Sequence, residues 1–225
     1  MPKPRDSSAH VAILLATILA FLPGLSASAP AGTGDFEQVF NAEGEPSWIH
    51  YGADYIDRHG THHLEVWRDH DMRILRKTDD RIEVNALRLG DDIRFAISDM
   101  VRHTVTTVDR LNLVRVGLFV DWFSQGHAVV RPTGTYKLSP LGTSEQILGR
   151  SCSMWRLTSL ASNSKSDICW DDALKLPLSI RGTDDRIVWR LTAVDDTPFP
   201  DSVFSSSASD LAPTDMNADF SGDAD

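Results

Sequence analysis

The sequence has few cysteines and no apolar run of membrane-spanning length. Cys152 and Cys169 are the only cysteines among its 225 residues. The apolar run Val11–Leu22 is shorter than the ~20 residues that a membrane-spanning helix needs. Two thiolates without paired spacing do not supply the four ligands of a structural zinc site. We expect no bound metal or cofactor, and a chain that is not transmembrane once a signal peptide is removed.

Basic residues are also in deficit. The chain has 22 Lys and Arg against 32 Asp and Glu, which gives a formal net charge of −10. Nucleic acids and anionic membrane surfaces select cationic proteins. We therefore expect no nucleic-acid partner and no electrostatic docking to a bilayer.

The beginning of the chain resembles an export signal. Lys3 and Arg5 precede the apolar run, and the small residues of segment 26–31 follow it. We predict a signal peptide over residues 1–31, with an uncleaved anchor as the alternative. The expected localisation is the periplasm of a Gram-negative envelope, or secretion. Because exported cysteines oxidise, we predict a disulfide between Cys152 and Cys169.

Short alternating segments follow from Ser47 onward. Ile49, Tyr51 and Ala53 alternate with polar residues, and polar turns recur about every ten residues up to Thr107. The intervals are too short for the helices of a parallel βαβ sheet. The pattern predicts a mainly β (α+β) fold of one domain over residues 32–204, built as a curved antiparallel sheet.

Two segments break the strand pattern. Asp35–Asn41 begins with an N-cap residue and predicts a short helix. Asp109–Ser124 has apolar residues three and four positions apart and predicts one helix, which Gly126 ends. Two buried strands around Gly117 are the alternative. A helix that is apolar around most of its circumference is buried or covers a cavity.

A hairpin between Gly149 and Ile180 contains both cysteines. If Cys152 lies opposite Cys169, then Met154 lies opposite Asp167 and the turn falls near 160–162. Alternation then places four apolar residues on the face away from the sulfurs. These are Trp155, Leu157, Ile168 and Trp170.

The last residues, 205–225, are rich in Ser and Asp and have no basic residue. They predict a disordered acidic tail. Within it, Asp215, Asn217 and Asp219 resemble the first half of a calcium loop. Phe220 stands where such a loop has glycine, and no glutamate closes it, so calcium is only the weaker alternative.

Segment 149–180 carries a family resemblance. Its Gly149-x-x-Cys152-x-x-Trp155, Cys169-Trp170 and Leu176-Pro177-Leu178 cadence is similar to the outer-membrane lipoprotein carrier (LolA-like) superfamily. The resemblance implies a half-open β-barrel covered by one or two helices, with an apolar cavity for a lipid or an acylated protein. RseB-like envelope regulators share this fold and bind a protein partner, which is the alternative function.

A sheet covered by an apolar helix predicts a ligand pocket lined by large apolar side chains. The candidates are Leu118, Phe119, Trp122, Phe123, Tyr51, Phe95, Trp155 and Trp170. Simple core packing is the alternative for all of them. The histidines of segment 59–63 suggest a polar turn more than a metal site, since His62 and His63 point to opposite faces of a strand. No nucleophile-elbow pattern is present, and we do not expect an enzyme.

Overall fold

The computed structural model describes residues 35–69, 72–115, 121–205 and 210–215. Residues 1–31, predicted as the signal peptide, lie outside this part of the chain. The first six strands are β1 (Trp48–Asp57), β2 (Gly60–Asp69), β3 (Arg73–Thr78), β4 (Ile82–Leu89), β5 (Asp92–Asp99) and β6 (Thr104–Asp109). The others are β7 (Tyr136–Ile147), β8 (Arg150–Ser159), β9 (Lys165–Asp171), β10 (Leu176–Arg181), β11 (Ile187–Asp195) and β12 (Ala212–Asp215).

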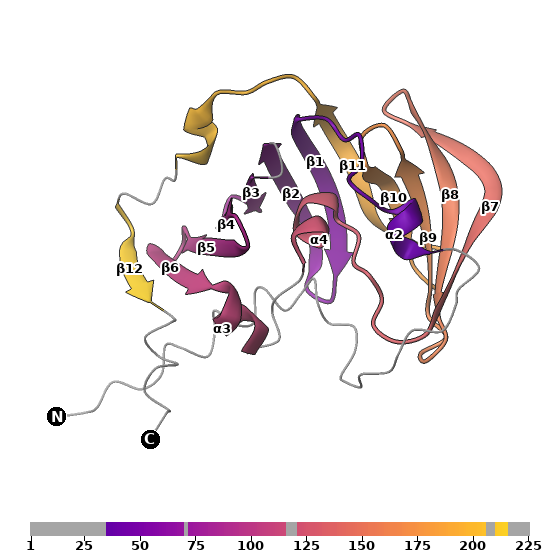
Figure 1. The fold of residues 1–225 in the computed structure, drawn as a ribbon, viewed down its shortest axis with the longest axis horizontal. Helices are drawn as coiled ribbons and strands as arrows, with labels where there is room; N and C mark the ends of the chain where they lie inside the picture. Colours follow the sequence, from indigo (N-terminus) through magenta and orange to yellow (C-terminus); the bar gives the residue numbers. More distant parts are fainter. Residues whose placement is uncertain (1–34, 70–71, 116–120, 206–209, 216–225) are drawn as a thin grey trace.

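All twelve described strands belong to one sheet, in the order β12-β6-β5-β4-β3-β2-β1-β11-β10-β9-β8-β7. Every pair except β12–β6 is antiparallel, and most neighbours are consecutive in the chain. This confirms the predicted antiparallel sheet. Figure 1 shows the sheet curving around two short helices, α2 (Phe36–Val39) and α4 (Trp122–His127), so the predicted curvature is also present. None of the helices in the described chain is long and apolar enough to cross a membrane.

The β8–β9 hairpin contains the disulfide between Cys152 and Cys169. Its predicted register was wrong by two residues, because Met154 and not Cys152 lies opposite Cys169. The cysteines are diagonal neighbours with Cα atoms 5.3 Å apart, a separation that a disulfide accommodates. The predicted faces are nevertheless correct, since Trp155 lies opposite Ile168 and the even shift keeps each residue on its side of the sheet.

The predicted helix over Asp109–Ser124 was wrong as a single element. The structure has α3 (Arg110–Arg115) and, after residues outside the described part, a separate helix α4. Asp121 is extended (φ −59°, ψ 163°) and accepts a hydrogen bond from Ser124 N, so it caps a new helix. Gly126 lies inside α4, and Ala128, with φ 55°, ends it. Apolar periodicity does not reveal such a break, because both helices continue the same pattern.

The acidic tail is only partly as predicted. Four of its residues, Ala212–Asp215, form β12, which pairs in parallel with β6. The hydroxyls of Thr106 and Thr214 lie 2.7 Å apart, and Leu211 is buried. The strand satisfies backbone groups along β6 that would otherwise be an open sheet edge. A 3₁₀ helix, η3 (Asp201–Phe204), precedes it.

Candidate functional site

A cavity of about 920 Å³ opens at one end of the sheet, next to α4. Three turns and two covering segments form its wall: the ends of β1 and β2, the β8–β9 turn, the β10–β11 turn, α4 and the chain after α4. The lining residues are Tyr55, Ile56, Asp57, Arg58, Leu64, Arg76, Ser124, Ala128, Val130, Ser164, Lys165, Ser166, Gly182, Thr183, Asp184, Arg186, Val188 and Trp189. Its size falls within the range of about 300–1,000 Å³ typical of small-molecule sites.

The β1–β2 turn is fixed by one carboxylate. Asp57 Oδ1 accepts hydrogen bonds from the backbone N–H groups of His59 (2.6 Å) and Gly60 (3.2 Å). Gly60 has φ 134°, a conformation that a side chain would strain. Asp57 Oδ1 also lies 3.0 Å from His62 Nε2. The turn therefore holds the neighbouring Arg58 beside the cavity, where Arg58 Nε donates a hydrogen bond to His59 Nε2 (2.9 Å).

His62 lies between two carboxylates. Its Nδ1 is 2.6 Å from Asp79 Oδ2 and its Nε2 is 3.0 Å from Asp57. The hydrogen bond to Asp79 is the largest influence on the pKa of His62 and raises it, and burial only partly opposes this shift. The imidazole stacks on Tyr55 with ring centroids 5.0 Å apart. This cluster ties the end of the β1–β2 hairpin to Asp79 in the turn after β3, beside the cavity.

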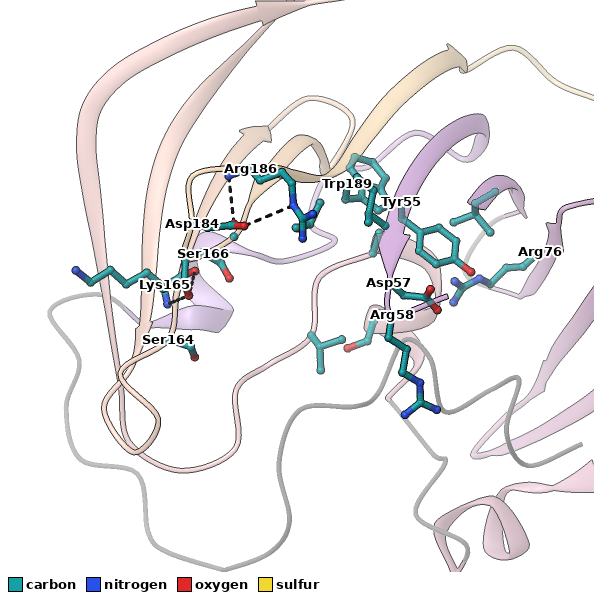
Figure 2. Close-up of a pocket in the computed structure, with 18 residues that line it drawn as sticks. Tyr55, Asp57, Arg58, Arg76, Ser164, Lys165, Ser166, Asp184, Arg186 and Trp189 are labelled. Carbon is teal, nitrogen blue, oxygen red and sulfur yellow. Dashed lines mark hydrogen bonds and ion pairs between the residues drawn. The ribbon is translucent and has the colours of Figure 1, made fainter. Parts of the chain in front are cut away.

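The opposite side is formed by two turns that are tied together. Lys165 N donates to Thr183 Oγ1 (3.0 Å), and the same hydroxyl donates to the Lys165 carbonyl (3.2 Å). Arg186 pairs with Asp184 at 3.5 Å. Figure 2 shows Arg186 and Arg76 reaching from opposite sides toward the space beside Tyr55 and Trp189.

Helix α4 covers the inner edge of the cavity and is seated by hydrogen bonds. The Gly126 carbonyl accepts from Tyr51 Oη (3.3 Å) and from Arg68 (3.2 Å). A Cβ atom on Gly126 would lie 2.9 Å from Arg68 Cδ, so glycine is needed for this approach. The position of α4 over β1 and β2 is thus set by close contacts at one residue.

A buried polar network lies behind this contact. Arg68 is 1% exposed and pairs with Glu45 at 3.1 Å. Glu45 lies 2.6 Å from His127 Nε2, and His127 Nδ1 donates to the Phe123 carbonyl (2.7 Å). Burial is the main reason why the pKa of His127 is lowered, Arg68 acts in the same direction, and Glu45 opposes both. None of Arg68, Glu45 and His127 lines the cavity.

The predicted pocket residues fall elsewhere. Tyr51, Phe95 and Trp122 are buried in the larger hydrophobic cluster, where they are 1%, 5% and 9% exposed. Phe123, Trp155 and Trp170 pack in or against a second cluster with Phe36 and Phe40 of the α2 segment. Leu118 and Phe119 lie outside the described residues. None of the six placed residues lines this cavity, so their role as ligand contacts stays a prediction.

Sequence reasoning did not single out the residues that form the cavity. Tyr55 continues the alternation of Tyr51 toward the end of β1, and Trp189 lies opposite it on β11. Arg76 follows the buried Ile74 in the same phase on β3, so a cation stands where the pattern calls for an apolar side chain. An ionisable residue in an apolar phase was the available signal.

Metal binding has no structural counterpart in the described chain. Within residues 35–69, 72–115, 121–205 and 210–215, no three His, Cys, Asp or Glu side chains form a group that could hold a metal ion. His63 pairs with Asp54 (2.9 Å), on the face away from His62. Asp215, from the weak calcium alternative, is in β12, whereas Asn217 and Asp219 lie outside the described residues.

The fold and site together define a disulfide-bonded, β-rich protein with a helix-bordered cavity. A disulfide is typical of proteins in an oxidising, exported environment. No protein-family model matches the sequence, and no curated protein matches it. Two solved structures of PNGF-II, in space groups C2 and P21, are similar at 8% and 10% identity with TM-scores of 0.41 and 0.42. They align with 76% and 77% of this chain, which spans only 31% and 32% of theirs. Similarity of this strength supports no inference about function.

Proposed function

We propose that this protein is a periplasmic carrier that binds a lipid or an acylated protein by holding an apolar chain in the cavity beside α4. The observation that carries the proposal is the cavity itself, about 920 Å³ in volume and walled by apolar side chains from β1, β2, the chain after α4, and β11. These are Ile56, Leu64, Ala128, Val130, Val188 and Trp189. Each methylene buried in such a site contributes about 0.8 kcal/mol, so a fatty chain needs little more than a dry space.

The proposal includes membership of the LolA-like superfamily and a cleaved signal over residues 1–31. A curved antiparallel sheet with short helices on its concave side agrees with the half-open barrel of that superfamily. The disulfide agrees with an oxidising compartment outside the cytoplasm. An RseB-like regulator would have the same compartment and sheet, but its ligand would be a protein.

A charge placed on the apolar wall tests the proposal. Val130 lines the cavity and is 40% exposed, so Val130→Glu adds a carboxylate there without disturbing the core. Val101→Glu is the matched control, because Val101 is 68% exposed in the β5–β6 turn and does not line the cavity.

Native mass spectrometry of protein purified from the exported fraction should show bound lipid in the wild type and in Val101→Glu. In Val130→Glu the bound lipid should fall about tenfold, because an apolar chain lying against this position would have to cover the new carboxylate. Equal lipid content in both variants would contradict the proposed site. Absence of lipid together with a crosslinked protein partner would favour the regulator.

A further inference from the structure

Charge is distributed unevenly around the cavity. Its wall carries four cationic side chains and two carboxylates, although the whole chain has a net charge of −10. The cations are those of Arg58, Arg76, Lys165 and Arg186, and the carboxylates are those of Asp57 and Asp184. The excess of cations on the cavity wall therefore opposes the repulsion that the overall charge of the protein exerts on an anion.

Both carboxylates already have partners. Asp184 pairs with Arg186, and Asp57 accepts hydrogen bonds from its own turn and lies against His62. Burial favours the neutral form of Asp57, but the hydrogen bonds from the His59 N–H and from His62 outweigh it and lower its pKa. Asp57 is therefore ionised and neutralised within the turn. Its buried Oδ2 has no hydrogen-bond partner in the described chain.

Arg76 differs from Arg68, the buried arginine that pairs with Glu45 beneath α4. It is half-buried, its guanidinium lies 3.3 Å from Gln125 Oε1, and no carboxylate of the described chain is within ion-pair distance. A guanidinium in such a position is stabilised by a bidentate carboxylate or phosphate. Trp189, 7% exposed, lines the same cavity and has an indole N–H without an acceptor among the described residues.

The geometry points to a single-chain amphiphile with an anionic headgroup as the ligand, and this inference rests on the proposed function. Arg76 binds the carboxylate or phosphate headgroup, and Arg186 contributes positive charge at the mouth. The chain lies along the apolar wall between Leu64, Val130 and Val188. Arg76 and Arg186 are thus specificity-determining residues, and Tyr55 separates the headgroup from the core.

Calorimetric titration with four probes distinguishes the contribution of the apolar chain to affinity from that of the headgroup charge. The probes are dodecanoate, dodecyl phosphate, dodecanol and inorganic phosphate. Both anionic chains should bind about tenfold more tightly than dodecanol, the usual worth of a charged hydrogen bond. Inorganic phosphate should not bind measurably. If dodecanol binds as tightly as dodecanoate, the proposed function stands and the headgroup inference is overturned. If none of the three twelve-carbon probes binds, the proposed function itself fails. Tight binding of inorganic phosphate alone overturns the inference that the ligand is an amphiphile.

Neutral variants locate the headgroup. Arg76→Gln should weaken dodecanoate about tenfold while leaving dodecanol unchanged. Arg186→Gln, at an exposed turn, should weaken it about threefold and remains informative even if Arg76→Gln does not fold. Arg190→Gln is the control, since this exposed arginine neighbours Trp189 on β11 and does not line the cavity. Equal losses in the Arg76, Arg186 and Arg190 variants would overturn the assignment, because they would reflect net charge alone.

Discussion

The two halves of the sheet hold their helices by different interactions. Over β1 and β2, α4 is positioned by hydrogen bonds from Tyr51 and Arg68 to the Gly126 carbonyl. Over β9, the α2 segment is held mainly by aromatic packing, with the rings of Phe40 and Trp170 5.0 Å apart, and by one hydrogen bond from Phe36 N to Tyr136 Oη (3.3 Å). The second half also contains the disulfide.

The difference concerns directionality. Hydrogen bonds and ion pairs require defined geometry, whereas apolar contact is roughly proportional to area and tolerates small shifts. The cavity borders α4 and not α2. The helix that borders the candidate site is therefore the one whose position is specified by polar groups.

Arg68→Met is expected to lower the free energy of unfolding by the largest amount, because Arg68 belongs to the polar network that positions α4. It leaves Glu45 and the Gly126 carbonyl without a buried cation, and loss of one member of a buried pair costs about 3–5 kcal/mol. Urea unfolding followed by circular dichroism measures the change. Arg190→Met, at an exposed position, should stay within about 0.5 kcal/mol of the wild type. Equal midpoints for the two variants would show that α4 does not depend on this pair.

Removal of the disulfide tests the other half. A Cys152→Ser, Cys169→Ser double variant reopens a loop with a sequence separation of 17 residues, which should cost about 3 kcal/mol on the chain-entropy model. The loss should appear in urea unfolding, and reduction of the wild type should reproduce it. Binding of dodecanoate to the folded variant should be unchanged, because neither cysteine lines the cavity. A weakened titration would show that the two halves are coupled.

The smallest expected effect is a pair of opposite pH dependences. The pKa of His62 is raised, so its contribution to stability is complete below the unfolded value of about 6.5 and is lost as pH rises through the folded value. The pKa of His127 is lowered, so its contribution is complete above about 6.5 and is lost as pH falls through the folded value. His62→Gln should flatten the alkaline side of the stability profile and His127→Gln the acidic side.

Urea unfolding at several pH values between about 5 and 9 gives the stability profile of each variant for comparison with that of the wild type. The carboxylates of Asp57 and Asp79 do not interfere, since their pKa values are lowered from an already acidic range. If both variants flattened the same side of the stability profile, the contrast between the buried His127 and His62, which lies between two carboxylates, would be contradicted.

Alternation and turn spacing were sufficient to predict the antiparallel sheet, because each strand has an apolar face and short polar turns. The disulfide could be predicted because the chain has only two cysteines and an expected exported location. The register of β8 and β9 could not, since a disulfide requires only a suitable Cα separation, which the diagonal pair also has at 5.3 Å. The break at Asp121 was missed because a capping residue within a continuous apolar pattern is indistinguishable from an exposed helical one.

The candidate site was harder to predict for a physical reason. Large aromatic residues such as Trp122 and Trp170 draw attention in a sequence, but here they fill the space between helix and sheet. The cavity is bordered by turns that come together only when the strand order is known, since β1 and β11 are neighbours in space and far apart in the chain. Arg76 is informative only once its phase along β3 and its missing carboxylate partner are both visible.

The short strand β12 has a consequence for how the chain folds as it is synthesised. It reaches β6 only after every other strand of the sheet has been synthesised, and until then the amide and carbonyl groups of Thr104–Thr107 are a template onto which a second polypeptide could add. Pro213, which lacks an N–H, makes β12 a poor template in its turn. Those few late residues therefore cover the β6 edge, which would otherwise stay open to pairing with another chain.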